Sequence, residues 1–69
     1  MNLELLALSL TRSIQSREAA RAALEKEQAA HPSELTLVKL EMTDDVLREL
    51  KGLQAEVRAC QSGQDNLNH

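Results

Sequence analysis

The stretch Ala29-Ala30-His31-Pro32-Ser33 divides the chain into two leucine-rich segments. Proline cannot continue a helix, and the residue before it is disfavoured in the helical conformation. The first segment is therefore predicted to end near Ala30. The two segments on either side of this break decide the fold.

The segment before the break has the pattern of a helix over about residues 3–30. Asn2 is a suitable N-cap residue, and apolar residues follow at spacings of three and four, which places them on one stripe of the helix. Leu5 and Leu8 point to another side, so the first turns are apolar on two faces, as in a helix that packs against two different elements. The stripe consists of Leu3, Leu6, Leu10 and Ile14.

Two arginines interrupt this stripe in the second half of the helix. Arg17 and Arg21 stand where leucines would continue it. Arginine is enriched at interface hot spots and binds carboxylates with a fork of N–H groups, so these two residues, with Arg12, are candidate partner-binding residues. The alternative is local ion pairing with Glu18 and Glu25.

Residues 31–42 are predicted to form a connector. Residues 35–38 favour a strand, and Leu40 and Met42 alternate with charged residues, so an extended segment is preferred. An isolated strand would need its copy in a second subunit, antiparallel across a two-fold axis, as a two-stranded ribbon. With the helical period, Ser33 would instead cap a short helix with Leu35, Val38 and Met42 on one face.

A second helix is predicted over about residues 44–62. Thr43 can cap it, and Asp44 and Asp45 suit the positive end of the helix dipole. Gly63 is predicted to end the helix in a left-handed conformation, with residues 63–69 as a flexible tail. Apolar residues repeat at spacings of four and three as a heptad seam of Val46, Leu50, Leu53, Val57 and Cys60, with Leu47 beside it.

The composition predicts that a single copy of this chain cannot bury enough apolar surface to fold stably by itself. The 69 residues contain no Phe, Tyr or Trp, although aromatic side chains supply much of the burial in so small a domain. The single cysteine cannot close a disulfide within the chain; we expect a buried thiol, with an intersubunit disulfide as the alternative. The sequence therefore predicts one mainly α domain over residues 1–69: two amphipathic helices joined by a short extended connector, in an obligate homodimer. Its core would contain Leu3, Leu6, Leu10, Ile14, Val46, Leu50, Leu53, Val57 and Cys60.

Two further groups are candidate partner-binding residues. Leu5 and Leu8 would remain partly exposed on the dimer, and an exposed apolar patch on a small protein marks an interaction surface. Glu41, Asp44 and Asp45 form an acidic group that could meet a basic surface such as the DNA-reading helix of a transcription factor. Helix capping explains Asp44 and Asp45 without a binding role.

Several classes of function are not expected. The net charge is −3 and the basic residues are dispersed, which argues against direct nucleic-acid binding. The sequence has no pattern of a metal site, phosphate loop or catalytic pair, so we expect no enzyme, cofactor or small-molecule ligand. Residues 1–10 contain Glu4 and are too short to span a bilayer, which predicts no signal peptide or anchor. The single cysteine, Cys60, which cannot close a disulfide within the chain, predicts a reducing cytoplasm.

The leading hypothesis is a dimer that binds another protein and blocks its activity. The alternatives are a coiled-coil or adaptor subunit of a larger assembly, and a ribbon-helix-helix repressor. Residues 35–49 are similar to the start of that repressor family, but the chain after Gly63 has no room for its second helix.

In size, acidity and helix–connector–helix layout, the chain resembles small phage-encoded inhibitors of bacterial host proteins, in particular the anti-activator, or anti-quorum-sensing, type. The resemblance implies binding to a LuxR-type transcriptional activator that keeps it from DNA, or to the type IV pilus assembly ATPase that some phage inhibitors target. It implies no particular site residue.

Overall fold

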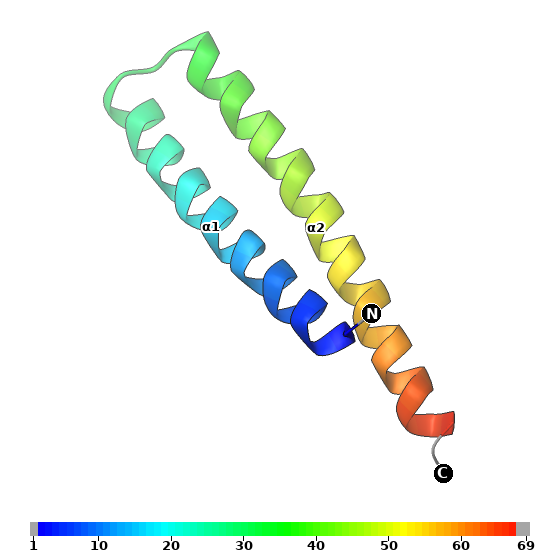
Figure 1. Ribbon diagram of the computed structural model, residues 1–69. Helices are drawn as coiled ribbons and strands as arrows, with labels where there is room; N and C mark the ends of the chain where they lie inside the picture. The colour runs from blue at the N-terminus through cyan, green and yellow to red at the C-terminus, as the bar shows by residue number, and fades with distance from the viewer. Residues whose placement is uncertain (1, 68–69) are drawn as a thin grey trace.

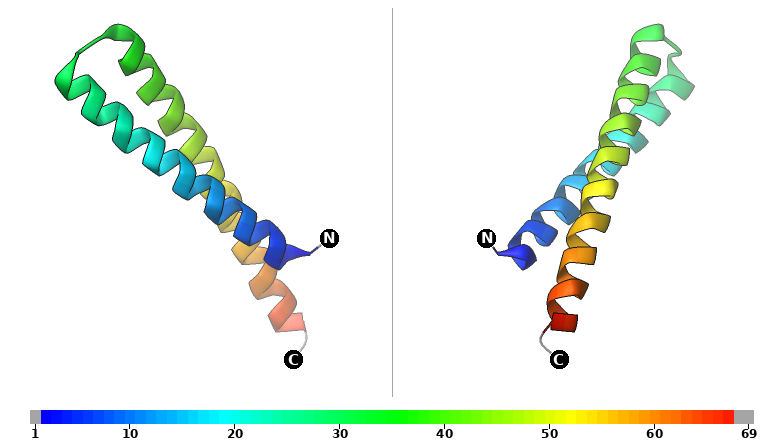
Figure 2. Two further views of the ribbon diagram at one scale, coloured as in Figure 1. Left: turned by 60° about the vertical axis from the view of Figure 1, so that its left-hand side comes forward. Right: turned by 90° about the vertical axis from the view of Figure 1, so that its right-hand side faces the viewer.

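The chain folds as a hairpin of two antiparallel helices (Figure 1). The computed structural model describes residues 2–67, in which α1 spans Leu3–Ala30 and α2 spans Glu34–Leu67. The molecule is rod-shaped, with extents of 56 × 16 × 15 Å. Because α2 has 34 residues and α1 has 28, the C-terminal end of α2 projects past the start of α1 (Figure 2). The predicted mainly α fold with two long helices is confirmed.

The ends of α1 follow the sequence prediction. The side chain of Asn2 accepts hydrogen bonds from the backbone N–H groups of Glu4 and Leu5, at 2.9 and 3.2 Å. At the other end, the N–H of His31 donates to the carbonyl of Glu27 at 2.7 Å, and Pro32 follows directly. The cap and the proline therefore set the bounds of the helix.

The turn between the helices is short because Ser33 starts α2 at once. Its hydroxyl oxygen accepts a hydrogen bond from the backbone N–H of Thr36 at 3.1 Å, which is the geometry of an N-cap. Its own N–H donates to the side-chain oxygen of Gln28 at 3.0 Å, which ties the turn to α1. Only residues 31–33 connect the helices.

The preferred extended connector over residues 31–42 is wrong, and the helical alternative capped by Ser33 is confirmed. A helix satisfies its backbone hydrogen bonds within itself, whereas a strand here would have no neighbour in the chain. Thr43 lies inside α2, where its hydroxyl donates to the carbonyl of Lys39 at 2.7 Å instead of capping a helix. The ribbon-helix-helix hypothesis fails with the strand on which it depended.

The predicted end of the second helix is also wrong. α2 continues through Gly63 to Leu67, and among residues 2–67 no glycine has a positive φ. No left-handed cap forms, so the predicted tail is helical as far as Leu67. Residues 68 and 69 lie outside the described residues.

The helices contact each other along one stripe on each. In α1 the buried and half-buried residues of this stripe are Leu3, Ala7, Leu10, Thr11, Ile14, Arg21, Leu24 and Gln28. In α2 they are Thr36, Leu40, Thr43, Leu47, Leu50, Gln54, Val57 and Gln61. Both sets repeat at spacings close to three and four, the pattern of helices that pack side by side. Among residues 2–63 the buried apolar side chains are Leu10, Ile14, Leu47 and Val57, each of which keeps 6–8% of its surface exposed.

The predicted seam of α2 is rotated from this stripe. Leu50 and Val57 face α1 and Val46 is half-buried, but Leu53 and Cys60 are exposed. Several residues that do face α1 are polar, including Thr36, Thr43 and Gln54. The spacing of the apolar residues therefore predicted the stripe beside the one that contacts α1. The buried thiol predicted for Cys60 is not found in the hairpin, because its stripe turns away from α1. In α1, Leu10 and Ile14 are buried, Leu3 is half-buried and Leu6 is exposed.

Replacing Ser33 by alanine is expected to lower the free energy of unfolding by about 0.5–2 kcal/mol, because α2 loses its N-cap. Thermal unfolding followed by circular dichroism measures the change. The matched control is Ser9→Ala, at an exposed position inside α1 where alanine is the better helix former. Equal effects of the two substitutions would show that the hydroxyl of Ser33 is not a cap.

Leu47→Ala is expected to cost about 2–5 kcal/mol, because the substitution leaves a cavity between the helices. Leu47 is only 6% exposed, whereas Leu37, in the same helix, is 49% exposed. Leu37→Ala should change stability by no more than about 0.5 kcal/mol. Urea unfolding at one fixed protein concentration compares them, and similar losses for both would contradict the interface described above.

Candidate protein-binding surfaces

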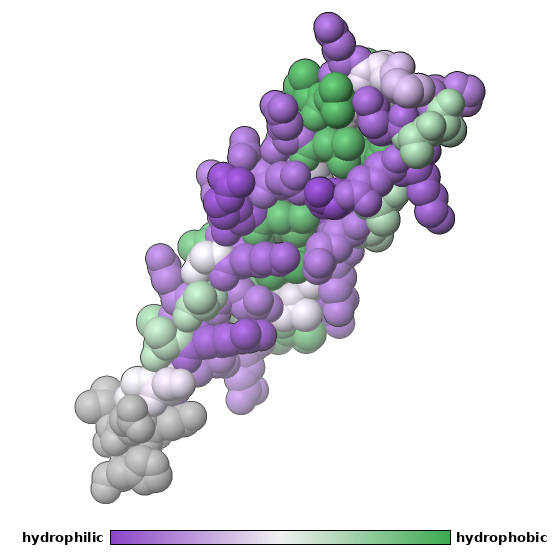
Figure 3. Space-filling view, turned by 180° about the vertical axis from the view of Figure 1, so that it is seen from behind, coloured by the Kyte–Doolittle hydropathy of each residue, from purple (hydrophilic) through white to green (hydrophobic). Residues whose placement is uncertain are grey.

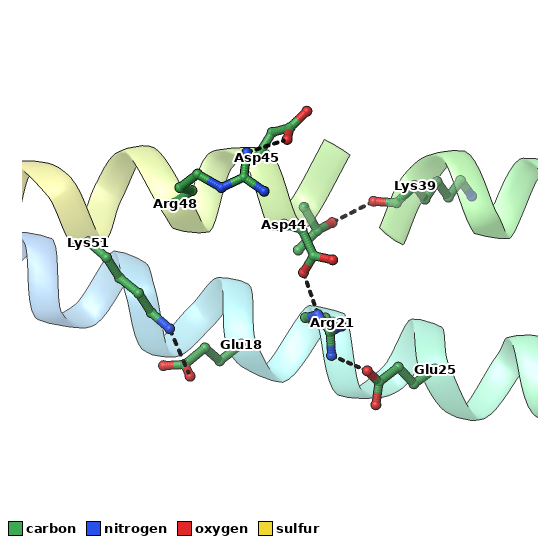
Figure 4. A network of polar contacts seen from close by, with 9 residues as sticks. Glu18, Arg21, Glu25, Lys39, Asp44, Asp45, Arg48 and Lys51 are labelled. Carbon is green, nitrogen blue, oxygen red and sulfur yellow. Dashed lines mark hydrogen bonds and ion pairs between the residues drawn. The ribbon is translucent and has the colours of Figure 1, made fainter. Parts of the chain in front are cut away.

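One long side of the hairpin is closed by charged residues (Figure 4). Arg21 of α1 forms ion pairs with Asp44 of α2 and with Glu25 one turn along α1. Farther along the same side, Lys51 of α2 lies 4.0 Å from Glu18 of α1. These residues line the shallow hollow on this side. Ion pairs thus bridge the two helices where apolar contact ends.

We call the side with Glu18, Arg21, Glu25, Asp44 and Lys51 the ionic side. Arg21 lies at its centre. The hydrogen bond that Arg21 donates to the carboxylate of Asp44 raises the pKa of Arg21 above its ordinary value, and the negative charges of Asp44 and Glu25 add to the effect. Its guanidinium group therefore stays charged while the helices are paired. Arg21 and Asp44 were both predicted to bind a partner, but in the structure they bind each other. The local pair between Arg21 and Glu25, the alternative explanation, is present.

The residues of the predicted acidic group lie within about 100° of one another on α2, but they have different surroundings. Asp44 turns toward α1, whereas Asp45, about 100° further round the helix, pairs with Arg48 at 3.5 Å. Glu41 is exposed. All three lie inside α2 instead of at its start, so the predicted capping role of Asp44 and Asp45 is wrong.

The opposite long side carries a shallow groove between the helices. Arg17 and Val46 each line two adjoining hollows. One hollow also has Arg12, Ser13, Ser16 and Leu50, and the next, toward the turn, has Leu24, Lys39, Met42 and Thr43. We call the two hollows together the side groove. It follows the predicted seam of α2, with Arg17 on its α1 border.

Large apolar side chains remain exposed over much of the hairpin. Figure 3 shows hydrophobic patches on one face, near the turn and about halfway along the rod. Among the described residues, the exposed large hydrophobic side chains are Leu5, Leu6, Leu8, Leu35, Leu37, Val38, Met42 and Leu53. They are twice as many as the buried ones, which is typical of a protein with an interaction surface.

Two of these leucines form a patch on the outer face of α1. Leu5 is 64% exposed and Leu8 is 46% exposed. Arg12 is also exposed and lies one turn beyond Leu8, on the same face. We call Leu5, Leu8 and Arg12 the outer patch. It corresponds to the second apolar face that the sequence predicted for the first turns of α1.

The described residues contain no group of three or more His, Cys, Asp or Glu side chains placed to hold a metal ion. Within the same part of the chain, neither helix has a stretch both long and apolar enough to cross a bilayer. The apolar surfaces and the charges beside them are the features that can bind a partner.

Comparisons with protein-family models, with curated proteins and with solved structures find no match to this chain. The functional assignment therefore depends on the residues of the hairpin and their placement.

Asp44→Asn is expected to lower the free energy of unfolding by less than about 1 kcal/mol, because both partners of the pair with Arg21 are partly exposed to solvent. The loss should be measurable at an ionic strength of about 0.01 M and should vanish near about 1 M, where salt screens such charges. Chemical denaturation at the two salt concentrations measures it. Asp45→Asn is the control, because Asp45 pairs only within α2 in the described structure. A loss that salt leaves unchanged would contradict the electrostatic role.

Proposed function

We propose that this chain is a protein-binding module that inhibits a regulatory protein, and that the outer patch makes the contact. The exposure of Leu5 and Leu8 carries the proposal. These two neighbouring leucines point away from α2 and are exposed, so they do not contribute to the contact between the helices. Such side chains lose contact with water only when a partner covers them.

The chemistry of the outer patch suits the apolar groove of a protein partner. Leu5 and Leu8 would fill an apolar depression, and Arg12 at their edge would orient the complex through a carboxylate or carbonyl group. The net charge of −3 favours a partner with a basic surface, because charge complementarity speeds association.

A DNA-binding regulator has such a basic surface. The resemblance to phage anti-activators supports a LuxR-type quorum-sensing transcription factor as the target, with the hairpin preventing the factor from binding its operator. The type IV pilus assembly ATPase is a further target of the same class of inhibitor.

A second candidate function is that of a structural subunit in a larger assembly. The exposed residues next to the turn, Leu35 and Val38, favour it, because they lie at the opposite end of the rod from the outer patch. An adaptor would use both ends at once, whereas an inhibitor of the proposed kind needs only the outer patch.

The test is fluorescence anisotropy of a labelled operator bound to a purified LuxR-type activator. Adding the hairpin should release the operator, and Leu5→Glu with Leu8→Glu should abolish the release, because the charges prevent burial of the outer patch. The control is Leu37→Glu, which changes an exposed leucine of α2 and should release the operator like the unaltered chain. Continued activity of the double variant, with circular dichroism unchanged, would exclude the outer patch; no release by the unaltered chain would exclude this target.

A further inference from the structure

The hairpin exposes more surface than a chain of its mass needs to expose. Its accessible surface is 5432 Å² for a mass of 7.7 kDa. A compact monomer of that mass exposes about 4,300 Å². The excess of about 1,100 Å² exceeds the roughly 800 Å² that each partner buries in a standard stable interface. A partner of ordinary size could therefore cover it.

In one hollow of the side groove, the α1 border has two small side chains, Ser13 and Ser16, between Arg12 and Arg17, and the α2 border has the bulkier Val46 and Leu50. Toward the turn, the lining consists of Leu24 on α1 and Lys39, Met42 and Thr43 on α2. A second copy turned by a two-fold axis would bring the bulky border of one chain against the small border of the other, twice in the same contact. Complementarity of this kind favours a copy of the same chain over an unrelated protein.

The charged residues that line the groove are all basic: Arg12 and Arg17 on α1 and Lys39 on α2. Arg17 lies on the α1 border and is exposed. Glu49 is exposed on the stripe of α2 that borders the groove, seven residues after Met42 and four before Leu53. The two-fold axis that pairs unlike borders would also bring Arg17 of each copy toward Glu49 of the other.

The ionic side is a less favourable binding surface for a second copy than the side groove. There, Arg21, Asp44 and Lys51 already bind groups within the hairpin. Burying these paired charges would cost desolvation free energy, whereas Arg12, Arg17 and Lys39 of the groove can pack their aliphatic stems and keep their charged ends in water. The groove side is therefore the favoured contact.

We propose that a second copy of this chain occupies the side groove and forms a two-fold four-helix bundle, in which α2 of each copy packs against α1 of the other. Leu5 and Leu8 of the outer patch, on another face of α1, stay exposed on both copies, whereas Arg12 at the edge of the patch also borders the groove. The proposal goes beyond the proposed function and does not depend on it.

Sedimentation equilibrium at micromolar concentrations tests the bundle directly. The unaltered chain should have twice its mass of 7.7 kDa. Met42→Lys, at a side chain that is 63% exposed in the hairpin and lines the groove, should raise the dimer dissociation constant at least tenfold. Leu37→Lys is the matched control, because Leu37 is also exposed on α2 but lies about 140° round the helix from Met42. It should leave the dimer intact.

The melting temperature of the unaltered chain should rise with protein concentration, because dimerisation stabilises the folded state by mass action. A charge exchange tests the groove even if the Met42→Lys variant fails to fold. Arg17→Glu and Glu49→Arg should each weaken the dimer, and the two substitutions together should restore it.

A monomer with a concentration-independent melting temperature would overturn the proposal, as would an assembly larger than a dimer. A dimer that Met42→Lys leaves intact, or a charge exchange that restores nothing, would overturn the assigned groove. Leu5→Glu with Leu8→Glu should leave the mass unchanged, so failure of the bundle and failure of the proposed function are distinguishable.

Discussion

The structure depends on the narrow line of contact between two helices. Two cylinders touch along one stripe each, and leucine, methionine and isoleucine are the bulkiest apolar side chains that this chain offers. Such a contact encloses Leu10, Ile14, Leu47 and Val57 but leaves most other large apolar side chains partly in water. The exposed leucines therefore follow from the architecture, and covering them is the main way in which this hairpin can gain stability or bind a partner.

Polar residues complete the contact where apolar ones are lacking. The side chain of Gln54 donates a hydrogen bond to the hydroxyl of Thr11 at 3.2 Å across the helices, and Arg21 reaches Asp44 on the ionic side. Partly exposed contacts of this kind contribute little free energy, but they are directional. They favour one register of α2 along α1 over its neighbours, which apolar contact along a smooth stripe does less well.

The two sides of the hairpin consequently have different uses. The ionic side is closed by its own charges, whereas the side groove has a basic lining, with the small Ser13 and Ser16 on α1 opposite the bulky Val46 and Leu50 on α2. In the proposed bundle the groove is filled by a second copy, and one outer patch remains on each chain. Two identical patches on one particle would raise the apparent affinity for a partner that also has two binding sites, provided that their spacing allows both to be engaged.

Residues close together along the chain account for its helical character, the N-cap at Asn2, the break at Pro32 and the local pair between Arg21 and Glu25, and these could be predicted from the sequence. The helical conformation of residues 34–42 became clear only in the folded hairpin, where a strand would have had no neighbour to bind. The tertiary structure also decided which stripe of α2 faces α1 and that Arg21 binds Asp44, 23 residues away. The spacing of apolar residues predicts the hydrophobic face of a helix. The side chains that meet across the hairpin also include threonine, glutamine and arginine, and their partners depend on the distance between the helices and not on spacing along the chain.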